Sequence, residues 1–499
     1  MFSTNDKALL EAGAQVILKA QHELDSITID SREVSDRIGF LAMPGTQADG
    51  NDFVCSAIKA GAPLIIMTRD VHEDELKLAL EHEVALYQTA DGLLFLDKLA
   101  RLYLEELDAL VVGITGSVGK TSTKQMFLAL ASKKYKAHAN RGNFNNNIGL
   151  PLTILSAPRD TEVLILEMGM NALGEIEYLS KLAHPSIAAI TQIGLAHIGM
   201  LGSQDAIAQA KSEILLGMKP YTAKAIPSLK SKMAVILNAN DPYSSYLKAQ
   251  AKNLGITPYL TYADAPELDL VPQSSTFDLS NQYASQDIFV KASSLELNEL
   301  AQAEFNYELQ ARTGKSRVRL GLAGMHNVSN ALLALAFAHL LDLSDEDIID
   351  ALASLEAEGG RQRLVKLKGG GRLIDDAYNA SPASMAASIA TLASIQTNGK
   401  KLAVLGDMKE LGKNERTYHY EIGTLVAGNK IDVLIAVGEL SKAMAQGALD
   451  AGMDANNVYH VIKPSEALEL LLALLKVDDI ALIKASHSTG LDLVVEGIE

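Results

Sequence analysis

The clearest chemical signal in the sequence is a glycine-rich segment, GITGSVGKTST, at residues 113–123. It follows a short apolar run and precedes residues that favour a helix beginning near Lys120. Successive backbone N–H groups in such a loop attract phosphate oxygens, and the lysine reaches the outer phosphates. The Thr121 hydroxyl is placed to bind Mg²⁺. The segment predicts a nucleoside triphosphate site, but it does not decide between an ATPase, a kinase, a GTPase and a ligase.

The loop departs from the strict phosphate-loop pattern at one position. Ile114 stands where that pattern has a glycine, six residues before the lysine, and the glycines are instead Gly113, Gly116 and Gly119. A glycine-rich turn without a ligand would show the same composition. The expected strand–loop–helix setting favours phosphate binding.

Other candidates follow apolar runs that we expect to be strands. Glu167 ends VLILEM, and His197 follows IAAITQI. Both are expected at the carboxyl edge of a parallel sheet, where ligands gather in open α/β folds. A solvated carboxylate or a structural histidine would look the same in sequence. Lys211 lies in AIAQAKSEIL, which by itself indicates a solvated charge on an amphipathic helix.

The elements that must hold these residues are short strands alternating with helices, a pattern typical of a parallel sheet. The first strand candidates are LVVGIT (110–115), VLILEM (163–168), IAAITQI (187–193) and MAVILNA (233–239). Residues 260–320 are more polar, and FVKASSLEL and VRLGLAG alternate as half-exposed antiparallel strands do. We therefore expect an antiparallel extension of the same domain.

Two further units complete the predicted α/β fold. A second strand–helix series begins near residue 346, with candidates RLIDDA, KLAVLG, DVLIAVG, VYHVI and IALIKA. A smaller unit contains ITIDS, GFLAM and PLIIM. We predict three domains: a small α/β domain at 1–107, a central phosphate-loop domain at 108–345, and a Rossmann-like domain at 346–499.

Composition narrows the classes of function. Among 499 residues, 44 Lys and Arg oppose 61 Asp and Glu, a net charge of −17, and 48% of residues are hydrophobic. These values exclude global disorder and argue against binding nucleic acid or an anionic membrane. The single Cys55 forms no intrachain disulfide and no cysteine-rich zinc site. Finding no targeting signal and no long apolar run, we expect a cytoplasmic protein without membrane insertion.

The phosphate loop and eight segments that follow it resemble the Mur ligases, ATP-dependent enzymes that build the peptidoglycan stem peptide. The eight segments are NFNNNIGLP (143–151), LEMGM (166–170), TQIGLAHIGMLGS (191–203), AIAQAKSEIL (206–215), LNANDP (237–242), GMHNVSNALLA (324–334), DDAYNASPASM (375–385) and VLGDMKELG (404–412). The resemblance implies amide formation, in which a carboxylate attacks the γ-phosphate of ATP to give an acyl phosphate and an amine then attacks the acyl carbon and displaces phosphate.

The resemblance also assigns roles to residues. It implies two Mg²⁺ sites and a carbamylated Lys211, a modification that needs a neutral amine. The implied metal-side residues are Thr121, Glu167, His197 and Lys211. The implied catalytic residues are Lys120, Lys211, His197, Glu167 and Arg361. Arg363 lies so close to Arg361 that the family's arginine could correspond to either residue.

The implied nucleotide-binding residues extend over two of the predicted domains. They are Gly116, Ser117, Gly119, Lys120, Thr121, Ser122, Asn238, Asp241, Asn327, Asn330, Arg361 and Asp376. Asparagine pairs a donor with an acceptor, which suits a base edge, although it also caps helices. We expect Asn330 to be helical and Asn327 to face the nucleotide.

Two segments, DDAYNASPASM and VLGDMKELG, are similar to those of family members that join D-alanyl-D-alanine to UDP-N-acetylmuramoyl-tripeptide. The stretch at 27–53 resembles their UDP-sugar unit. The implied substrate-binding residues are Ser31, Arg32, Asn146, Asn147, Tyr378, Asn379 and Ser384. Asp407 and Glu410 lie in the second segment, where helix-capping charges are the alternative. We expect small-molecule partners and a monomer.

The chain departs from the family at two places. Lys484-Ala485-Ser486-His487 stands where the family has Lys-Gly-Ser-Arg, and Asn51 stands where a histidine is usual. The first change weakens a fixed grip on a substrate carboxylate. It leaves open a related ligase that uses another amine or acyl acceptor. A nucleotide-binding partner without catalysis is the remaining alternative.

Overall fold

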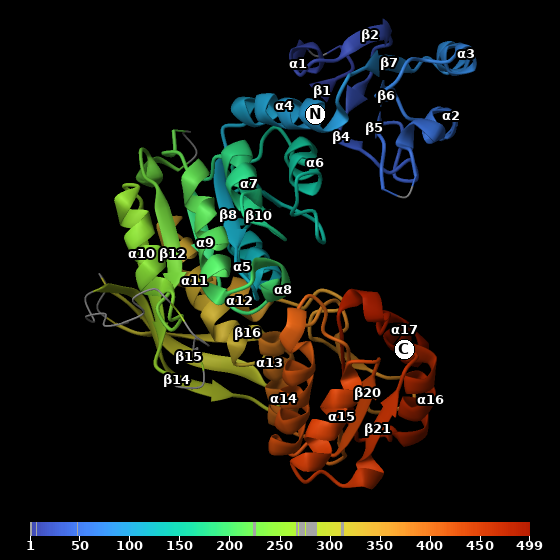
Figure 1. Cartoon of the computed structure of the whole chain (residues 1–499). Coiled ribbons are helices and arrows are strands. Elements are labelled where there is room, and N and C mark those ends of the chain that lie inside the picture. Colours follow the sequence, from blue (N-terminus) through green and yellow to red (C-terminus); the bar gives the residue numbers. More distant parts are fainter. Residues whose placement is uncertain are drawn as a thin grey trace.

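The computed structural model describes residues 2–5, 7–46, 48–222, 226–265, 268, 275, 287–310 and 314–499. Figure 1 shows three bodies along the chain, each with its own sheet. The three larger sheets have five, nine and six strands, and β1 pairs with β3 separately. The predicted three-part α/β class is confirmed. The exact limits at 107/108 and 345/346 stay a prediction.

The N-terminal body is a five-stranded sheet in the order β2-β7-β6-β5-β4. The predicted segments ITIDS, GFLAM and PLIIM contribute β4, β5 and β6, whereas the edge pair β2 and β7 was not predicted. The elements of this body are β1 (Phe2–Ser3), α1 (Lys7–Glu11), β2 (Gln15–Leu18), β3 (Glu23–Leu24), β4 (Ser26–Thr28), β5 (Ile38–Ala42), α2 (Val54–Lys59), β6 (Leu64–Met67), α3 (Glu73–Glu81), β7 (Ala85–Gln88) and α4 (Gly92–Glu106).

The central body holds the nine-stranded sheet, in the order β16-β15-β14-β13-β12-β11-β8-β10-β9. Its strands are β8 (Leu110–Thr115), β9 (Ala137–Ala139), β10 (Val163–Glu167), β11 (Ile187–Ile190), β12 (Ala234–Asn238), β13 (Thr257–Ala263), β14 (Ile288–Leu297), β15 (Gln302–Leu309) and β16 (Ser316–Ala323). Its helices are α5 (Lys120–Ala131), α6 (Gly149–Ser156), α7 (Glu175–Ala183), α8 (Ile198–Leu201), α9 (Gln204–Ser212), α10 (Ser244–Asn253), α11 (His326–Leu340) and α12 (Asp345–Ala353).

The antiparallel extension is confirmed for β14, β15 and β16. The predicted segments FVKASSLEL and VRLGLAG correspond to β14 and β16, and β15, which was not predicted, lies between them. One detail of the prediction is wrong. β13 pairs in parallel with both β12 and β14, so the change to antiparallel pairing comes later than residue 260. Most of the predicted extension between residues 266 and 286 lies outside the described residues.

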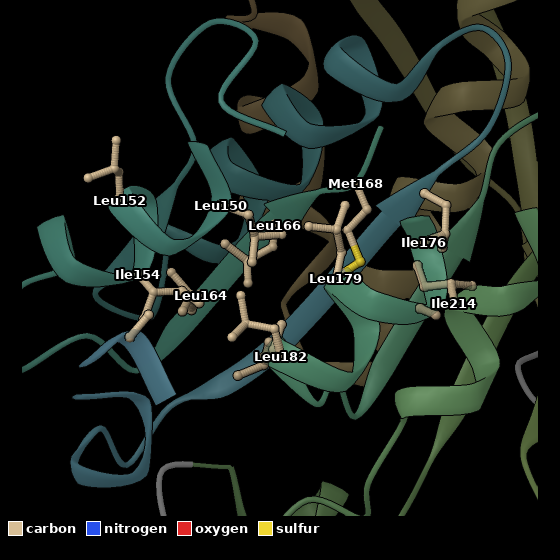
Figure 2. Close-up of a cluster of buried hydrophobic side chains, with 14 of the residues drawn as sticks. Leu150, Leu152, Ile154, Leu164, Leu166, Met168, Ile176, Leu179, Leu182 and Ile214 are labelled. Carbon is tan, nitrogen blue, oxygen red and sulfur yellow. The ribbon is translucent and has the colours of Figure 1, made fainter. Parts of the chain in front are cut away.

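The strands at the centre of this sheet are buried on both faces. In β10, Val163 and Ile165 pack into one core, whereas Leu164 and Leu166 pack into the other. Successive side chains of a strand point to opposite faces, so a strand covered on both sides must be apolar throughout. Figure 2 shows the second core, beneath α6 and α7.

The opposite face of the central sheet is covered by α5, α11 and α12. The rings of Phe127 in α5 and Phe337 in α11 stack with centroids 4.2 Å apart. α12 begins at Asp345, so nearly all of it lies beyond the predicted limit at 345/346. It nevertheless packs against α5 and β16, and Ile348 and Leu352 belong to the core of the central body. The six-stranded sheet begins only at residue 363.

The C-terminal sheet has the order β17-β18-β22-β19-β20-β21, with only β17 antiparallel. All five predicted strands are present, and β17 was missed. The elements are β17 (Arg363–Lys366), β18 (Arg372–Asp376), α13 (Pro382–Ser394), β19 (Lys401–Gly406), α14 (Glu415–Gly428), β20 (Val433–Val437), α15 (Ser441–Asp450), β21 (Val458–Val461), α16 (Pro464–Leu474), β22 (Ile480–Lys484) and α17 (Asp492–Ile498). Among the described helices of all three bodies, none has the length and apolarity to cross a membrane.

Candidate active site

A cavity of about 670 Å³ lies between the central and C-terminal sheets. The central body contributes the phosphate loop, the end of β10 and the start of α11, and the C-terminal body contributes the segments that follow β18, β19 and β22. The cavity therefore lies at the carboxyl edge of both parallel sheets, where open α/β folds bind ligands. The predicted residues that line it are Ser117, Gly119, Lys120, Thr121, Ser122, Asn146, Glu167, His197, Asn327, Asn330, Arg361, Asp376, Tyr378, Asn379 and Ser384.

Two glycines give the phosphate loop its shape. Gly116 and Gly119 have φ angles of 146° and 87°, which L-residues rarely adopt. A Cβ atom at Gly116 would lie 1.9 Å from Thr191 Oγ1, and one at Gly119 would lie 2.4 Å from Asn330 Oδ1. Ile114 is buried inside β8, so the departure from the strict pattern falls in the strand rather than in the loop.

Lys120 begins α5 and turns back over the loop, where its Nζ donates a hydrogen bond to the Gly116 carbonyl at 2.8 Å. Burial lowers the pKa of this ammonium, and the charge of Arg361 adds to that effect while Glu167 opposes it. Two cations from different bodies therefore approach one another at the cavity. Such a pair is stabilised by an anion placed between them.

Glu167 ends β10 beside the loop, as predicted, and its carboxylate is nearly fully buried. It accepts hydrogen bonds from Thr121 Oγ1 and Asn145 Nδ2, both at 2.9 Å. Lys124 Nζ lies 3.9 Å from Glu167 Oε2. Thr121 and Glu167, both predicted on the metal side, are therefore hydrogen-bonded to each other.

Three residues of this cluster were missed in the sequence. Lys124 donates to the Asn140 carbonyl at 2.8 Å, and Asn140 in turn bonds both the backbone N–H and the carbonyl of Glu167. Asn145 lies inside the motif NFNNNIGLP, but only the two asparagines that follow it, Asn146 and Asn147, were predicted as site residues. Lys124 stands four residues after Lys120, a spacing that puts both on one helix face and could have identified it.

Lys211 is not a surface charge, contrary to what the helix pattern alone indicates. It is fully buried in α9, and its Nζ has no hydrogen-bond partner among the described residues. Burial lowers its pKa well below the ordinary value, and the charge of Lys120 lowers it further, while Glu167 and two other glutamates act in the opposite direction. A buried amine of low pKa is the neutral form that carbamylation requires.

His197 directly precedes α8 and has a left-handed backbone, with φ of 66°. Its Nδ1 lies 2.8 Å from Glu410 Oε2, which comes from the C-terminal body. Burial lowers the pKa of His197, the charge of Lys211 lowers it further, and Glu410 opposes both effects. The imidazole therefore lies where the two bodies meet.

The first turn of α11 forms the wall opposite Glu167. Asn330 donates to Asn327 Oδ1 at 3.0 Å, and Asn327 donates to the Ala323 carbonyl at 2.7 Å. Asn330 is helical, as expected, and Asn327 is helical as well. Neither side chain caps the helix, because the N-cap residue is Met325 and has no capping side-chain bond.

The C-terminal wall is built around the end of β18. The Arg361 guanidinium lies over the Tyr378 ring, 4.0 Å from its centroid. Oδ2 of Asp376 accepts hydrogen bonds from Lys484 at 2.8 Å and from Ser388 at 2.6 Å. Ser384 caps α13 together with Ser381. Arg363 instead pairs with Asp375 and Glu499, so Arg361 is the arginine at the cavity.

Some predicted residues lie outside the cavity. Asn238 and Asp241 hold the turn after β12, where Asp241 accepts hydrogen bonds from the backbone of Ile193 and Tyr243 and burial raises its pKa to about 7. Gly116 and Lys211 pack behind the lining residues, and Asn147 is exposed. Ser31 and Arg32 follow β4 in the N-terminal body, where Arg32 pairs with Asp30.

Comparison with known proteins covers the whole chain. Residues 23–103 match the Mur ligase family catalytic domain, residues 114–338 the Mur ligase middle domain, and residues 360–487 the Mur ligase glutamate ligase domain. The UDP-N-acetylmuramoyl-tripeptide–D-alanyl-D-alanine ligase of Bacillus subtilis is 33% identical, with 100% of this chain and 99% of that protein covered. The chain belongs to the Mur ligase family.

Solved structures of Mur ligases agree with this assignment. MurF from Acinetobacter baumannii superposes with a TM-score of 0.80 at 29% identity, with 100% and 99% of the two chains covered. MurF from Thermotoga maritima, solved in complex with ADP, gives a TM-score of 0.73 at 25% identity, with 95% and 96% covered.

This Mur ligase accommodates both of its sequence departures. Asn51 is buried and donates to Asp49 and Thr68, so it supports the N-terminal sheet. His487 is exposed at the cavity, with its ring centroid 6.2 Å from that of Tyr378. The His487 imidazole therefore stands on the C-terminal wall of the site.

The donor set of this Mur ligase fits Mg²⁺ at Thr121 and Glu167. A hydroxyl and a carboxylate are the hard oxygen donors that Mg²⁺ prefers. The described residues contain no cluster of three His, Cys, Asp or Glu side chains that could hold a metal alone. The orphaned Nζ of Lys211 is consistent with a further oxygen-bearing group at that position.

Proposed function

We propose that this Mur ligase joins D-alanyl-D-alanine to UDP-N-acetylmuramoyl-tripeptide, with cleavage of ATP to ADP and phosphate. The similarity to full-length relatives named for that reaction carries the proposal. The cavity supports it, because a phosphate loop on one body faces, on the other, a wall that follows the strands of a second parallel sheet.

The reaction requires two anions, a carboxylate and the γ-phosphate, to approach each other. Lys120 and Arg361 supply positive charge from opposite sides of the cavity, and the backbone N–H groups of the loop add a cradle for phosphate oxygens. The acyl phosphate that forms would hydrolyse in water. The placement of the site between two bodies allows their closure to exclude water before the amine attacks.

Bound Mg²⁺ would neutralise phosphate charge and polarise the phosphoryl group. We propose that Thr121 and Glu167 hold one ion and that His197 and a carbamylated Lys211 serve the second. The buried, unpaired Lys211 amine supports the carbamate, because CO₂ reacts with a neutral amine.

We assign one substrate to each body. Residues 1–107 would hold the UDP-sugar through Ser31 and Arg32, residues 108–345 ATP, and residues 346–499 the incoming dipeptide. Asn327 and Asn330 would face the nucleotide, while Tyr378, Asn379 and Ser384 would meet the dipeptide and Asn146 the acyl substrate. Because ATP and UDP-linked precursors are intracellular, we propose action in the cytoplasm, and we propose a monomer.

Phosphate release tests the proposal directly. Phosphate should appear at full rate only when ATP, Mg²⁺, the UDP-tripeptide and D-alanyl-D-alanine are all present, and omission of any one should stop it. Release that ignores the dipeptide, or that does not need the UDP-sugar, would refute the assignment. Because His487 stands on the amine-side wall, the assay should include other dipeptides and single amino acids. Preference for one of these would favour a related ligase with another amine substrate.

A further inference from the structure

One contact between the central and C-terminal bodies is formed by two short segments, residues 195–199 before and within α8, and residues 408–412 after β19. The backbone N–H of Gly199 donates to the Glu410 carbonyl at 3.0 Å. A Cβ atom at Gly199 would lie 2.7 Å from both the Glu410 oxygen and the Gly412 nitrogen. The two backbones therefore approach more closely than any residue other than glycine permits.

Side chains extend this contact on both sides. Leu195 and Ile198 of the central body pack against the C-terminal core that contains Met408 and Leu411. The Glu410 carboxylate lies 2.8 Å from His197 Nδ1. A backbone bond, an apolar anchor and a charged contact thus coincide within a few residues.

The backbones of His197 and Glu410 have φ angles of 66° and 64°, although neither residue is a glycine. Residues keep a left-handed conformation of this kind only when their surroundings determine it, and such residues gather at functional sites. Here His197 and Glu410 contact each other, so each residue helps to determine the conformation of the other. His197 also lines the cavity that contains Lys120 and Glu167.

We propose that residues 408–412 form a latch through which the C-terminal body fixes His197 at the active site, with Glu410 as the positioning residue. When the latch is engaged, the His197 imidazole of the central body is held in place by residues of the C-terminal body. When the C-terminal body moves away, His197 loses both its carboxylate partner and the support for its backbone. The site is then complete only in the closed arrangement.

Hydrogen exchange measured by mass spectrometry tests the latch without relying on catalysis. In Gly199→Ala, whose new methyl group collides with residues 410 and 412, exchange in peptides covering 195–201 and 408–412 should rise at least about fivefold. Glu410→Gln should raise exchange at 195–201, because a neutral amide replaces the carboxylate that lies beside His197 Nδ1. Glu469→Gln, at an exposed glutamate on α16, is the control and should exchange like the wild type.

Exchange unchanged at both segments in Gly199→Ala would overturn the latch. Exchange at 195–201 unchanged in Glu410→Gln would overturn the role of the carboxylate. Melting curves identify a variant that is merely unfolded, because exchange would then rise throughout the chain.

The catalytic consequence rests on the proposed ligase function. With the four substrates, Glu410→Gln should lower kcat by about tenfold or more with KM for ATP changed by less than about twofold, since small misplacements in a site reduce turnover strongly. A wild-type kcat in this variant would show that Glu410 does not position His197 for the reaction. If the wild type itself shows no dipeptide-dependent turnover, the ligase proposal fails while the exchange result stands.

Discussion

Replacing Gly119 by alanine should damage the phosphate loop in two separable ways. The first is conformational, because φ is 87° and an L-residue in the left-handed region costs roughly 1–2 kcal/mol. The second is steric, because the new Cβ would lie 2.4 Å from Asn330 Oδ1. To make room, the Asn330 amide must move, which threatens its hydrogen bond to Asn327 and leaves a buried polar group unpaired at a cost of about 1–3 kcal/mol.

Gly174 provides a matched control for the conformational cost. It precedes α7 as Gly119 precedes α5, its φ is 88°, and a Cβ there would meet nothing within 4 Å. Gly174→Ala should therefore lose roughly 1–2 kcal/mol, and Gly119→Ala roughly 2–5 kcal/mol from the two costs together. Calorimetric melting of both variants measures the difference, which isolates the collision with Asn330.

Nucleotide affinity separates the two variants more sharply. Because the loop amides hold the phosphates, we expect ATP to bind Gly119→Ala at least about tenfold more weakly, which corresponds to about 1.4 kcal/mol. Isothermal titration should show Gly174→Ala within about twofold of the wild type. Equal melting temperatures and equal ATP affinities for the two variants would refute the reasoning.

Three further changes test other parts of the site. Lys124→Met removes the donor to the Asn140 carbonyl and the cation beside Glu167. The melting temperature should therefore drop by an amount equivalent to roughly 3 kcal/mol. Lys124→Arg should lose less stability, and an unchanged melting temperature for Lys124→Met would contradict this prediction. Burial lowers the pKa of His326 to about 4, below the roughly 6.5 of a histidine in the unfolded chain. Unfolded chains therefore take up the proton first, and the free energy of unfolding should decline as the pH falls from about 6.5 to 4. His326→Gln should flatten that decline, and identical pH profiles of the melting temperature for the variant and the wild type would count against this. Lys211→Ala should abolish phosphate release, short carboxylates should restore part of it, and full activity without them would refute the carbamate.

The sequence predicted the parallel strands β8, β10, β11 and β12 well because each is buried on both faces and reads as an uninterrupted apolar run. It missed β15 and β17, which lie in antiparallel segments whose exposed face makes the hydrophobic signal intermittent. It also missed β13, which carries Pro258 and Thr261 and is less uniformly apolar. Position in the sheet alone did not decide the outcome, because the edge strands β4, β16 and β21 were predicted whereas the inner strand β13 was missed.

The phosphate-loop residues could be predicted from local spacing, since loop, lysine and helix are consecutive. The burial of Lys211 could not, because the helix pattern around it indicates a solvent-exposed face and only the packing of other segments covers it. The same limit applies to the contact of His197 with Glu410, which are 213 residues apart in the chain and meet only through the arrangement of two bodies. In the structure the side chains of Asn238 and Asp241 close a turn, and the ligand role assigned to them stays a prediction.

The position of α12 has a consequence for how the chain could be divided or recombined. Because Ile348 and Leu352 complete the core over α5 and β16, the central body carries this helix with it, and a fragment cut before residue 345 would expose an apolar surface. The segment between Ala353 and Arg363, which includes Gly359 and Gly360, connects the central body to the C-terminal body and is where the chain is best divided. A graft made there would exchange the C-terminal body and leave the central body intact. If each body holds the substrate proposed for it, this offers a route by which a family of ligases could change its incoming amine while keeping its use of ATP.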